Sequence, residues 1–149
     1  MQVIEDVKAE LAPRAYPTSD ELRRGQALVL FGPKGCGKTT IALKIAAQYG
    51  PFVETDARRL EKPGVLNDLL ESEPRAVICD GIPKTGETFT QIKAMIADKI
   101  NGHGMITVMA NKNRKTMATP NFIFCTSDPT LFPIFPRVAT DWLFHVIDL

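Results

Sequence analysis

The eight residues GPKGCGKT, 32–39, constrain the fold of this chain more than any other feature. They fit the pattern G-x-x-x-x-G-K-[ST] at every position. A continuous apolar run, ALVLF, precedes them, and a segment with helical apolar spacing, 37–49, follows. An apolar strand, a glycine-rich loop and a helix together place backbone N–H groups and the positive end of the helix around a phosphate. The sequence therefore predicts an α/β domain with a nucleotide-phosphate site.

The residue types of this pattern also predict individual roles. Lys38 is expected to reach the β- and γ-phosphates of ATP, and Thr39 to hold Mg²⁺. Asp80 ends a second apolar run, 76–80, which is the usual position of the acid that holds Mg²⁺ through water. Cys36 is interpreted as a small filler of the loop, with a reactive thiol as the alternative. The predicted nucleotide-binding residues are Gly32, Pro33, Lys34, Gly35, Cys36, Gly37, Lys38, Thr39 and Thr40.

The rest of the chain alternates between strand and helix patterns. Continuous apolar runs of this kind are typical of buried parallel strands, and their alternation with helices predicts a three-layer α/β fold around a mostly parallel five-stranded sheet. A β-hairpin is expected over 106–119, where two short arms flank a polar tip. The other expected strands are 27–31, 52–55, 76–80, 121–128 and 141–149, and the other helices are 63–70 and 87–100.

Residues 1–25 are expected to form an N-terminal helical extension, and 26–149 the nucleotide-binding domain. MQVIEDVKAELA has apolar residues at helical spacing. A capping-box pattern, Thr18 to Glu21, opens a second short helix or turn. The role of this extension is left open by the sequence.

Composition limits where the protein works and what it binds. The 149 residues contain no apolar run long enough for a membrane span and carry a net charge of +1. Three cysteines lack metal-site spacing, which favours a reducing cytosol without disulfides. The N-terminus does not resemble a signal peptide, so a cytoplasmic protein is expected, or a nuclear one if the source is a eukaryotic virus. Any contact with nucleic acid must come from a local basic cluster.

The sequence also bears on two other classes of nucleotide-binding protein. A GTPase needs D-x-x-G and N-K-x-D, but the residues after Asp80 fail the first pattern, and Arg114 stands where the guanine-reading acid of the second belongs. A small-molecule kinase would close a basic lid over the phosphates, and 112–115 could imitate one. The apolar run that follows, NFIFCTSD, is left unexplained by a lid. The kinase remains an alternative.

The order of the motifs resembles that of superfamily 3 helicases, an AAA+-related group of viral, phage and plasmid replication proteins. The resemblance lies in GPKGCGKT, in FIFCTSD after a basic hairpin, and in PRVATDWLFHV, and it covers about residues 26–149. It implies a sheet order of 5-1-4-3-2. It also implies a DNA-replication ATPase that forms a homo-oligomer, usually a hexameric ring, with ATP between subunits. Other replication proteins are implied as further partners.

The resemblance also implies roles for residues beyond the phosphate loop. Arg137 would reach the γ-phosphate of the neighbouring subunit as an arginine finger. The hairpin tip would hold the backbone of single-stranded DNA in the ring's pore, with Lys112, Arg114 and Lys115 as the contacting residues.

Two departures from the family pattern bear on catalysis. The family has a second acid after the metal-holding Asp, and here the residue is Gly81; its sensor strand ends in Asn, and here Asp128 stands at that position. Our hypothesis is that Asp128, on the adjacent strand, supplies the missing carboxylate, with Glu87 as a second candidate. The alternative is a weakly hydrolysing nucleotide-binding module that regulates assembly.

Overall fold

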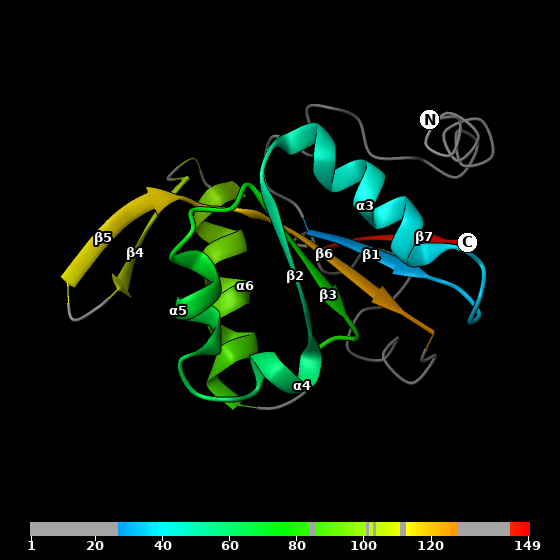
Figure 1. The fold of residues 1–149 in the computed structure, drawn as a ribbon, viewed down its shortest axis with the longest axis horizontal. Coiled ribbons are helices and arrows are strands. Elements are labelled where there is room, and N and C mark those ends of the chain that lie inside the picture. Colours follow the sequence, from blue (N-terminus) through cyan, green and yellow to red (C-terminus); the bar gives the residue numbers. More distant parts are fainter. Residues whose placement is uncertain (1–26, 84–85, 101, 103, 111–112, 128–143) are drawn as a thin grey trace.

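The computed structural model describes residues 27–149 except 84–85, 101, 103, 111–112 and 128–143. Figure 1 shows one sheet with α3 on one face and α4, α5 and α6 on the other, and a separate hairpin at one end. The predicted three-layer α/β fold is therefore confirmed. The elements are β1 (Ala27–Phe31), α3 (Lys38–Tyr49), β2 (Phe52–Asp56), α4 (Ala57–Leu60), α5 (Val65–Leu70), β3 (Ala76–Asp80), α6 (Gly86–Ile100), β4 (Met105–Ala110), β5 (Asn113–Ala118), β6 (Asn121–Thr126) and β7 (Phe144–Asp148).

The five strands of the main sheet are parallel and lie in the order β2-β3-β6-β1-β7. This is the predicted order 5-1-4-3-2, read from the other edge and with the hairpin strands left out of the count. β6 lies between β3 and β1, with Asp80 opposite Cys125 and Phe31 opposite Thr126. The carboxyl end of β1, which leads into the phosphate loop, and the carboxyl end of β3, at Asp80, therefore lie at the same edge of the sheet, on either side of β6.

The face of the sheet under α3 is closed by one apolar cluster. The buried residues of α3 repeat at the helical spacing that faces the sheet: Ile41, Ala42, Ile45 and Ala46. They pack with Leu28, Leu30 and other side chains of the same face. This packing fixes the direction of α3, whose first residue follows the phosphate loop.

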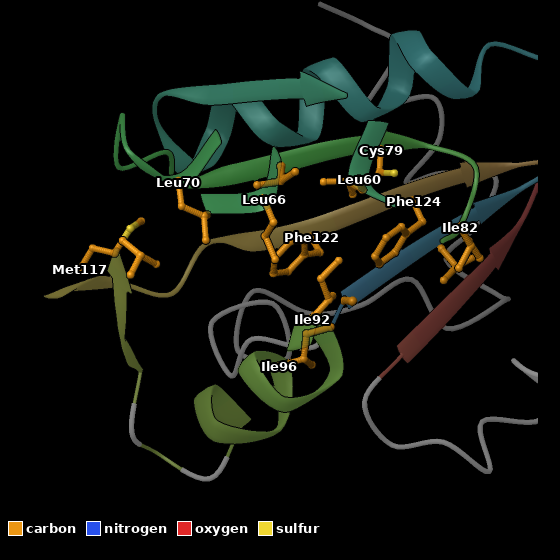
Figure 2. Close-up of a cluster of buried hydrophobic side chains, with 14 residues drawn as sticks. Leu60, Leu66, Leu70, Cys79, Ile82, Ile92, Ile96, Met117, Phe122 and Phe124 are labelled. Atoms are coloured by element: carbon orange, nitrogen blue, oxygen red, sulfur yellow. The ribbon is translucent and has the colours of Figure 1, made fainter. Parts of the chain in front are cut away.

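The opposite face carries the larger apolar cluster, to which α4, α5, α6 and the hairpin all contribute. Figure 2 shows Phe122 and Phe124 of β6 directed toward Ile92 and Ile96 of α6. The two phenylalanine rings are stacked, with centroids 6.2 Å apart. The loop after Asp80 enters this cluster through Ile82, which is buried, so the chain beyond β3 is held against the sheet.

The predicted hairpin is confirmed as antiparallel β4 and β5. Val108 and Met117 are buried in the larger cluster, whereas Met105 and Met109 on the other side of β4 are about half exposed. One part of the prediction needs correction: Arg114 lies within β5, opposite Met109, and not at the tip. The arms of the hairpin are longer than the polar pattern of 111–115 indicates, because pairing continues to Asn113.

Some expected elements differ in extent or lie outside the described residues. The helix expected over 63–70 begins at Val65, after Gly64 in the left-handed conformation. The four-residue helix α4 was not predicted; Asp56 caps it by accepting a hydrogen bond from the Arg59 N–H at 2.9 Å. The N-terminal extension, 1–25, lies outside the described residues. In the described part of the chain, no helix has the length and apolar character needed to cross a membrane.

Candidate nucleotide site

The phosphate loop connects β1 to α3 at the carboxyl edge of the sheet. Gly35 and Gly37 have φ of 82° and 91°, a region that other residues enter only with strain. Gly32 is required for a different reason, because a Cβ there would lie 2.7 Å from the Cys36 sulfur. These glycines allow the backbone of the loop to turn tightly.

Gly37 is also the N-cap of α3, and no side chain caps this helix. The first N–H groups of the helix are therefore left for an external acceptor, which is the usual basis of anion binding at a helix N-terminus. Thr39 and Thr40, in the first turn, are exposed beside them. The loop and helix together form a cradle for a polyphosphate.

The ammonium group of Lys38 lies over this loop. Its Nζ donates hydrogen bonds of 2.8 Å to the carbonyl oxygens of Gly32 and Pro33. The Cys36 sulfur is 3.9 Å away. The chain thus holds its cation at the centre of the cradle, where it would meet the phosphates predicted from the sequence.

The loop is also fastened to β6. Gly32 N–H donates to the Thr126 carbonyl at 3.2 Å, and the Cys125 thiol approaches the Lys38 carbonyl at 3.9 Å. The sensor strand β6 therefore contacts the phosphate loop through its backbone as well as through the sheet.

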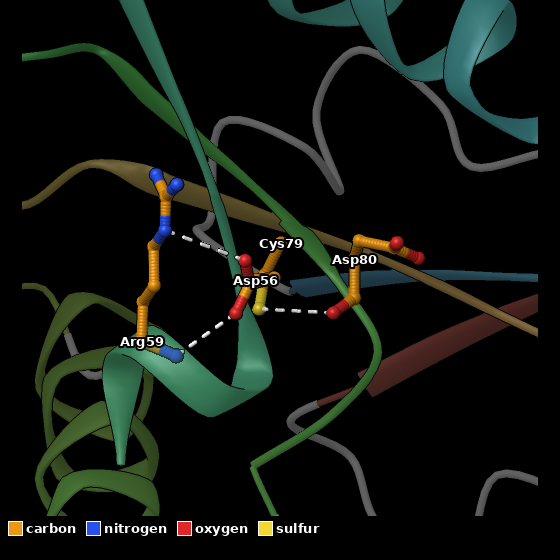
Figure 3. Close-up of polar contacts among 4 residues, drawn as sticks. All are labelled: Asp56, Arg59, Cys79 and Asp80. Carbon is orange, nitrogen blue, oxygen red and sulfur yellow. Dashed lines mark hydrogen bonds and ion pairs between the residues drawn. The ribbon is translucent and has the colours of Figure 1, made fainter. Parts of the chain in front are cut away.

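Asp80 ends β3 with its side chain exposed. Figure 3 shows its carboxylate turned away from Asp56 and Arg59, although Asp56 lies opposite it in the sheet. Asp56 is instead occupied by Arg59, whose Nε is 3.6 Å from its carboxylate. No hydrogen bond or ion pair joins the Asp80 carboxylate to the described residues. The two carboxylate oxygens of Asp80 are of the type that binds a hydrated Mg²⁺.

Gly81, the departure from the family pattern, has a conformational explanation. Its φ is 86°, and its N–H donates to the Cys125 carbonyl at 2.7 Å. A Cβ at this position would lie 3.3 Å from the Cβ of Ala57. The backbone turns here in a way that favours glycine, so an acid could not be added without strain.

We therefore expect Gly81→Glu to lower the free energy of unfolding by about 1–2 kcal/mol, the cost of a left-handed non-glycine residue. ATP turnover is expected not to rise. Denaturant unfolding and steady-state ATP hydrolysis measure the two effects. Gly81→Asn is the matched control, because asparagine tolerates this conformation better and should lose less stability. A Glu variant with unchanged stability and faster turnover would contradict this explanation.

The three cysteines differ sharply in environment. Cys79 and Cys125 are buried on neighbouring strands, and they point to opposite faces of the sheet. Burial, reinforced by the charge of Asp80, raises the pKa of Cys125 to about 12. Burial, with Asp56 and Asp80, also raises the pKa of Cys79. Cys36, in the phosphate loop, is partly exposed.

This contrast predicts selective alkylation. Iodoacetamide at pH 8 should modify Cys36 and spare the two buried thiols, since attack requires an exposed thiolate. ATP with Mg²⁺ should slow the reaction, because the loop would close around the phosphates. Intact mass and peptide mapping measure the sites, and Cys36→Ser is the control that should stay unmodified until it is unfolded. Equal labelling of Cys125 in the native protein would show the prediction to be wrong.

The remaining predicted site residues fall into three groups. Glu87 is exposed in the first turn of α6. Arg114 is exposed on β5, whereas Lys115 donates to the Glu71 carbonyl at 3.0 Å and lies 3.5 Å from the Glu73 carboxylate. The turn after α5 thus holds Lys115 and reduces its availability for DNA. Lys112, Asp128 and Arg137 lie outside the described residues.

The sequence reasoning overlooked Asp56 as a neighbour of Asp80. The signal was present, because FVETD ends in an acid before ARRL, a short segment that an Asp N-cap can open. The pairing of Asp56 with Asp80 follows only from the sheet register. Its role is structural, since it caps α4 and pairs with Arg59.

The residues of the phosphate loop, together with Asp80, fit a nucleoside triphosphate with Mg²⁺. The cradle offers N–H groups and one cation, while Thr39 and Asp80 offer oxygen ligands. Among the described residues, no group of three or more His, Cys, Asp or Glu could hold a metal by itself. The fold and the site define a phosphate-loop nucleotide-binding domain.

The chain belongs to the AAA family, the ATPase family associated with various cellular activities, whose family model matches residues 28–124. The matched segment runs from β1 into β6 and includes the phosphate loop and Asp80. ATP and Mg²⁺ are the ligands that ATPases of this family use in general.

Two of the individual proteins to which this chain is similar are RuvB proteins. The chain is 44% identical over 62 residues to the Holliday junction branch migration complex subunit RuvB of Prochlorococcus marinus. This alignment covers 38% of this chain and 17% of that protein. A mutant RuvB of Thermotoga maritima has a similar fold, with a TM-score of 0.58 and 18% identity, over 100% of this chain and 45% of that chain. The chain thus spans less than half the length of either RuvB.

Proposed function

We propose that this chain is an ATP-hydrolysing motor domain that acts on DNA as part of a ring of subunits. The observation that carries the proposal is the phosphate cradle, in which Lys38 is held by two loop carbonyls beside an uncapped helix. The Asp80 carboxylate, which has no hydrogen bond or ion pair with the described residues, lies at the same edge of the sheet and supports hydrolysis over binding alone. The similarity to a branch migration subunit supports DNA as the substrate on which the motor acts.

In this proposal each residue acts on a different part of the nucleotide. Lys38 binds the β- and γ-phosphates, and Thr39 and Asp80 hold Mg²⁺ directly or through water. Arg137 of a neighbouring subunit offsets the negative charge that develops on the γ-phosphate. Asp128 accepts a proton from, or orients, the attacking water. The adjacency of β3 and β6 supports this last role, because Asp128 follows the strand that pairs with β3.

A motor of the superfamily 3 type is the more specific form of the proposal. Its support is the hairpin that immediately precedes β6, on which Arg114 is exposed. In a ring, several copies of this hairpin would surround a central strand of DNA, and a local basic cluster would act despite a net charge of only +1. Arg114 is the better candidate for DNA contact, since Lys115 is already paired with Glu73.

A weakly hydrolysing assembly module is the second candidate, and Gly81 favours it. Gly81 has no side chain that could position the attacking water. Its left-handed conformation makes replacement by an acidic residue costly in stability. In that case ATP would promote ring formation without rapid turnover, and Asp128 would not act as a base.

The deciding experiment measures steady-state ATP hydrolysis with Mg²⁺, with and without single-stranded DNA, at concentrations that allow ring formation. Turnover that DNA stimulates supports the motor. Tight ATP binding with oligomer formation but no turnover supports the assembly module. Asp128→Ala should abolish turnover and retain ATP binding; turnover that survives this change would reject Asp128 as the substitute acid.

A further inference from the structure

A second pocket lies at the opposite edge of the sheet from the phosphate loop. It has a volume of about 410 Å³, and its walls include Arg75, Lys99, Thr119 and Asn121. Arg75 precedes β3 and Asn121 opens β6, so the pocket lies at the amino ends of these strands. The phosphate loop follows the carboxyl end of β1, about 16 Å away across a five-residue strand. The two sites are therefore separate.

Two cations face this pocket. Lys99, in the last turn of α6, donates to the Thr119 carbonyl at 2.8 Å and to the Asn121 side-chain oxygen at 3.1 Å. An ammonium group has three N–H donors, so one remains for a ligand. Arg75 is exposed, and no carboxylate of the described residues forms an ion pair with Arg75 or Lys99.

The electrostatics of Lys99 agree with this geometry. Burial, and then the nearby charge of Arg75, lower the pKa of Lys99 to about 8. Two like charges with no ion-pair partner among the described residues create a local positive field. An anion bound between them would relieve this repulsion.

Thr119, on the same wall, is 3% exposed, and its hydroxyl oxygen is buried without a hydrogen bond. Because this oxygen has almost no accessible surface, it is not offered to a ligand in the pocket, and the polar contacts come from the two cations. A structural role at the end of α6 explains Lys99 but not the exposed Arg75.

We propose that this pocket binds a phosphate group, with Arg75 and Lys99 as the charged contacts. The guanidinium fork of Arg75 matches phosphate oxygens in geometry as well as in charge. The group belongs either to the backbone of a single DNA strand or to a small phosphomonoester. The base of the hairpin, at Gly104 and Ala118, borders the pocket, so a strand that contacts Arg114 could continue into it. The site does not depend on ATP hydrolysis.

The test uses the full chain with Lys38→Ala, so that the phosphate loop contributes little. Arg75→Gln and Lys99→Gln are each compared with a control that removes the same charge from the exposed turn around α4, Arg58→Gln and Lys62→Gln. Binding of a fluorescent oligothymidylate of about twelve nucleotides is measured by anisotropy. Binding of inorganic phosphate is measured by calorimetry.

The pocket variants should lose about tenfold or more in affinity for at least one of the two probes, while both controls keep the parent affinity. Loss for the oligonucleotide alone identifies a DNA backbone site, and loss for inorganic phosphate identifies a small-molecule site. Equal affinities in all variants, or no binding of either probe by the parent, would overturn the proposal. Because Arg75 is exposed, its variant should fold even if Lys99→Gln does not.

Discussion

Lys38→Ala is expected to lower ATP turnover by about a hundredfold or more. The ammonium group lies in the phosphate cradle, 2.8 Å from two carbonyl oxygens of the loop. Removing it takes away the cation that would stabilise negative charge on the transferred phosphoryl group, and loss of one such donor typically costs a factor of 10²–10³. The measurement is steady-state hydrolysis at saturating Mg²⁺-ATP, together with the affinity for a fluorescent ATP analogue.

Lys44→Ala is the matched control for this change. Lys44 lies on the same helix, is partly buried and is not among the residues predicted to bind the nucleotide, so its loss should leave turnover nearly unchanged. If Lys38→Ala kept more than about a tenth of the parent activity, the cradle would not be the hydrolytic site. The same comparison guards against a general loss of folded protein, because both changes place alanine in α3, where it is a good helix former.

Phe124→Ala should lower the free energy of unfolding by about 3–5 kcal/mol, the range for deleting a fully buried phenylalanine. Phe124 is 0% exposed and lies on β6, which is hydrogen-bonded to β3 and to β1. Its ring packs in the cluster under α6 and stacks on Phe122. A domain of this size has a total stability of about 5–15 kcal/mol, so the variant should melt about 10 °C lower. Thermal and urea unfolding followed by circular dichroism measure the change.

The control is Phe89→Ala on α6, because Phe89 is only partly buried against the same cluster. It should cost less than half as much as Phe124→Ala, since less apolar area returns to water. Equal losses at the two positions would mean that the sheet around β6 can collapse into the cavity. Such a result would also weaken the view that β6 holds the phosphate loop in place.

The regular parts of this fold could be predicted because their signals are local. The two apolar runs that became β1 and β3 match the strands residue by residue, and both are buried on both faces. The glycine loop between β1 and α3 is specified by its own spacing. The sheet order was not worked out from the strands themselves; it followed from the resemblance to a known family.

The interactions that could not be predicted join residues far apart in the chain. Lys115 forms an ion pair with Glu73 because the hairpin packs near the turn after α5. The local sequence of neither segment predicts this contact. The second pocket likewise brings together residues that are far apart in the chain, namely Arg75, Lys99 and Thr119. Gly81 has a left-handed conformation, and its N–H donates to the carbonyl of Cys125, which is far away in the chain. The sequence does not show this contact, and from the sequence alone Gly81 resembles a position that has lost an acid.

The parallel pairing of the main sheet has a consequence for the order in which the protein folds. Leu28 pairs with Ile123 on one side and with the backbone of 145 on the other, so β1 can join the sheet only when distant segments are brought together. The hairpin, in contrast, joins neighbouring segments and can close in about 1–10 μs. Non-local pairing is slow because chain entropy is lost before contacts compensate for it. We therefore expect the cradle that follows β1 to form late in folding, and a chain still emerging during synthesis to gain its nucleotide site only after β6 has joined the sheet.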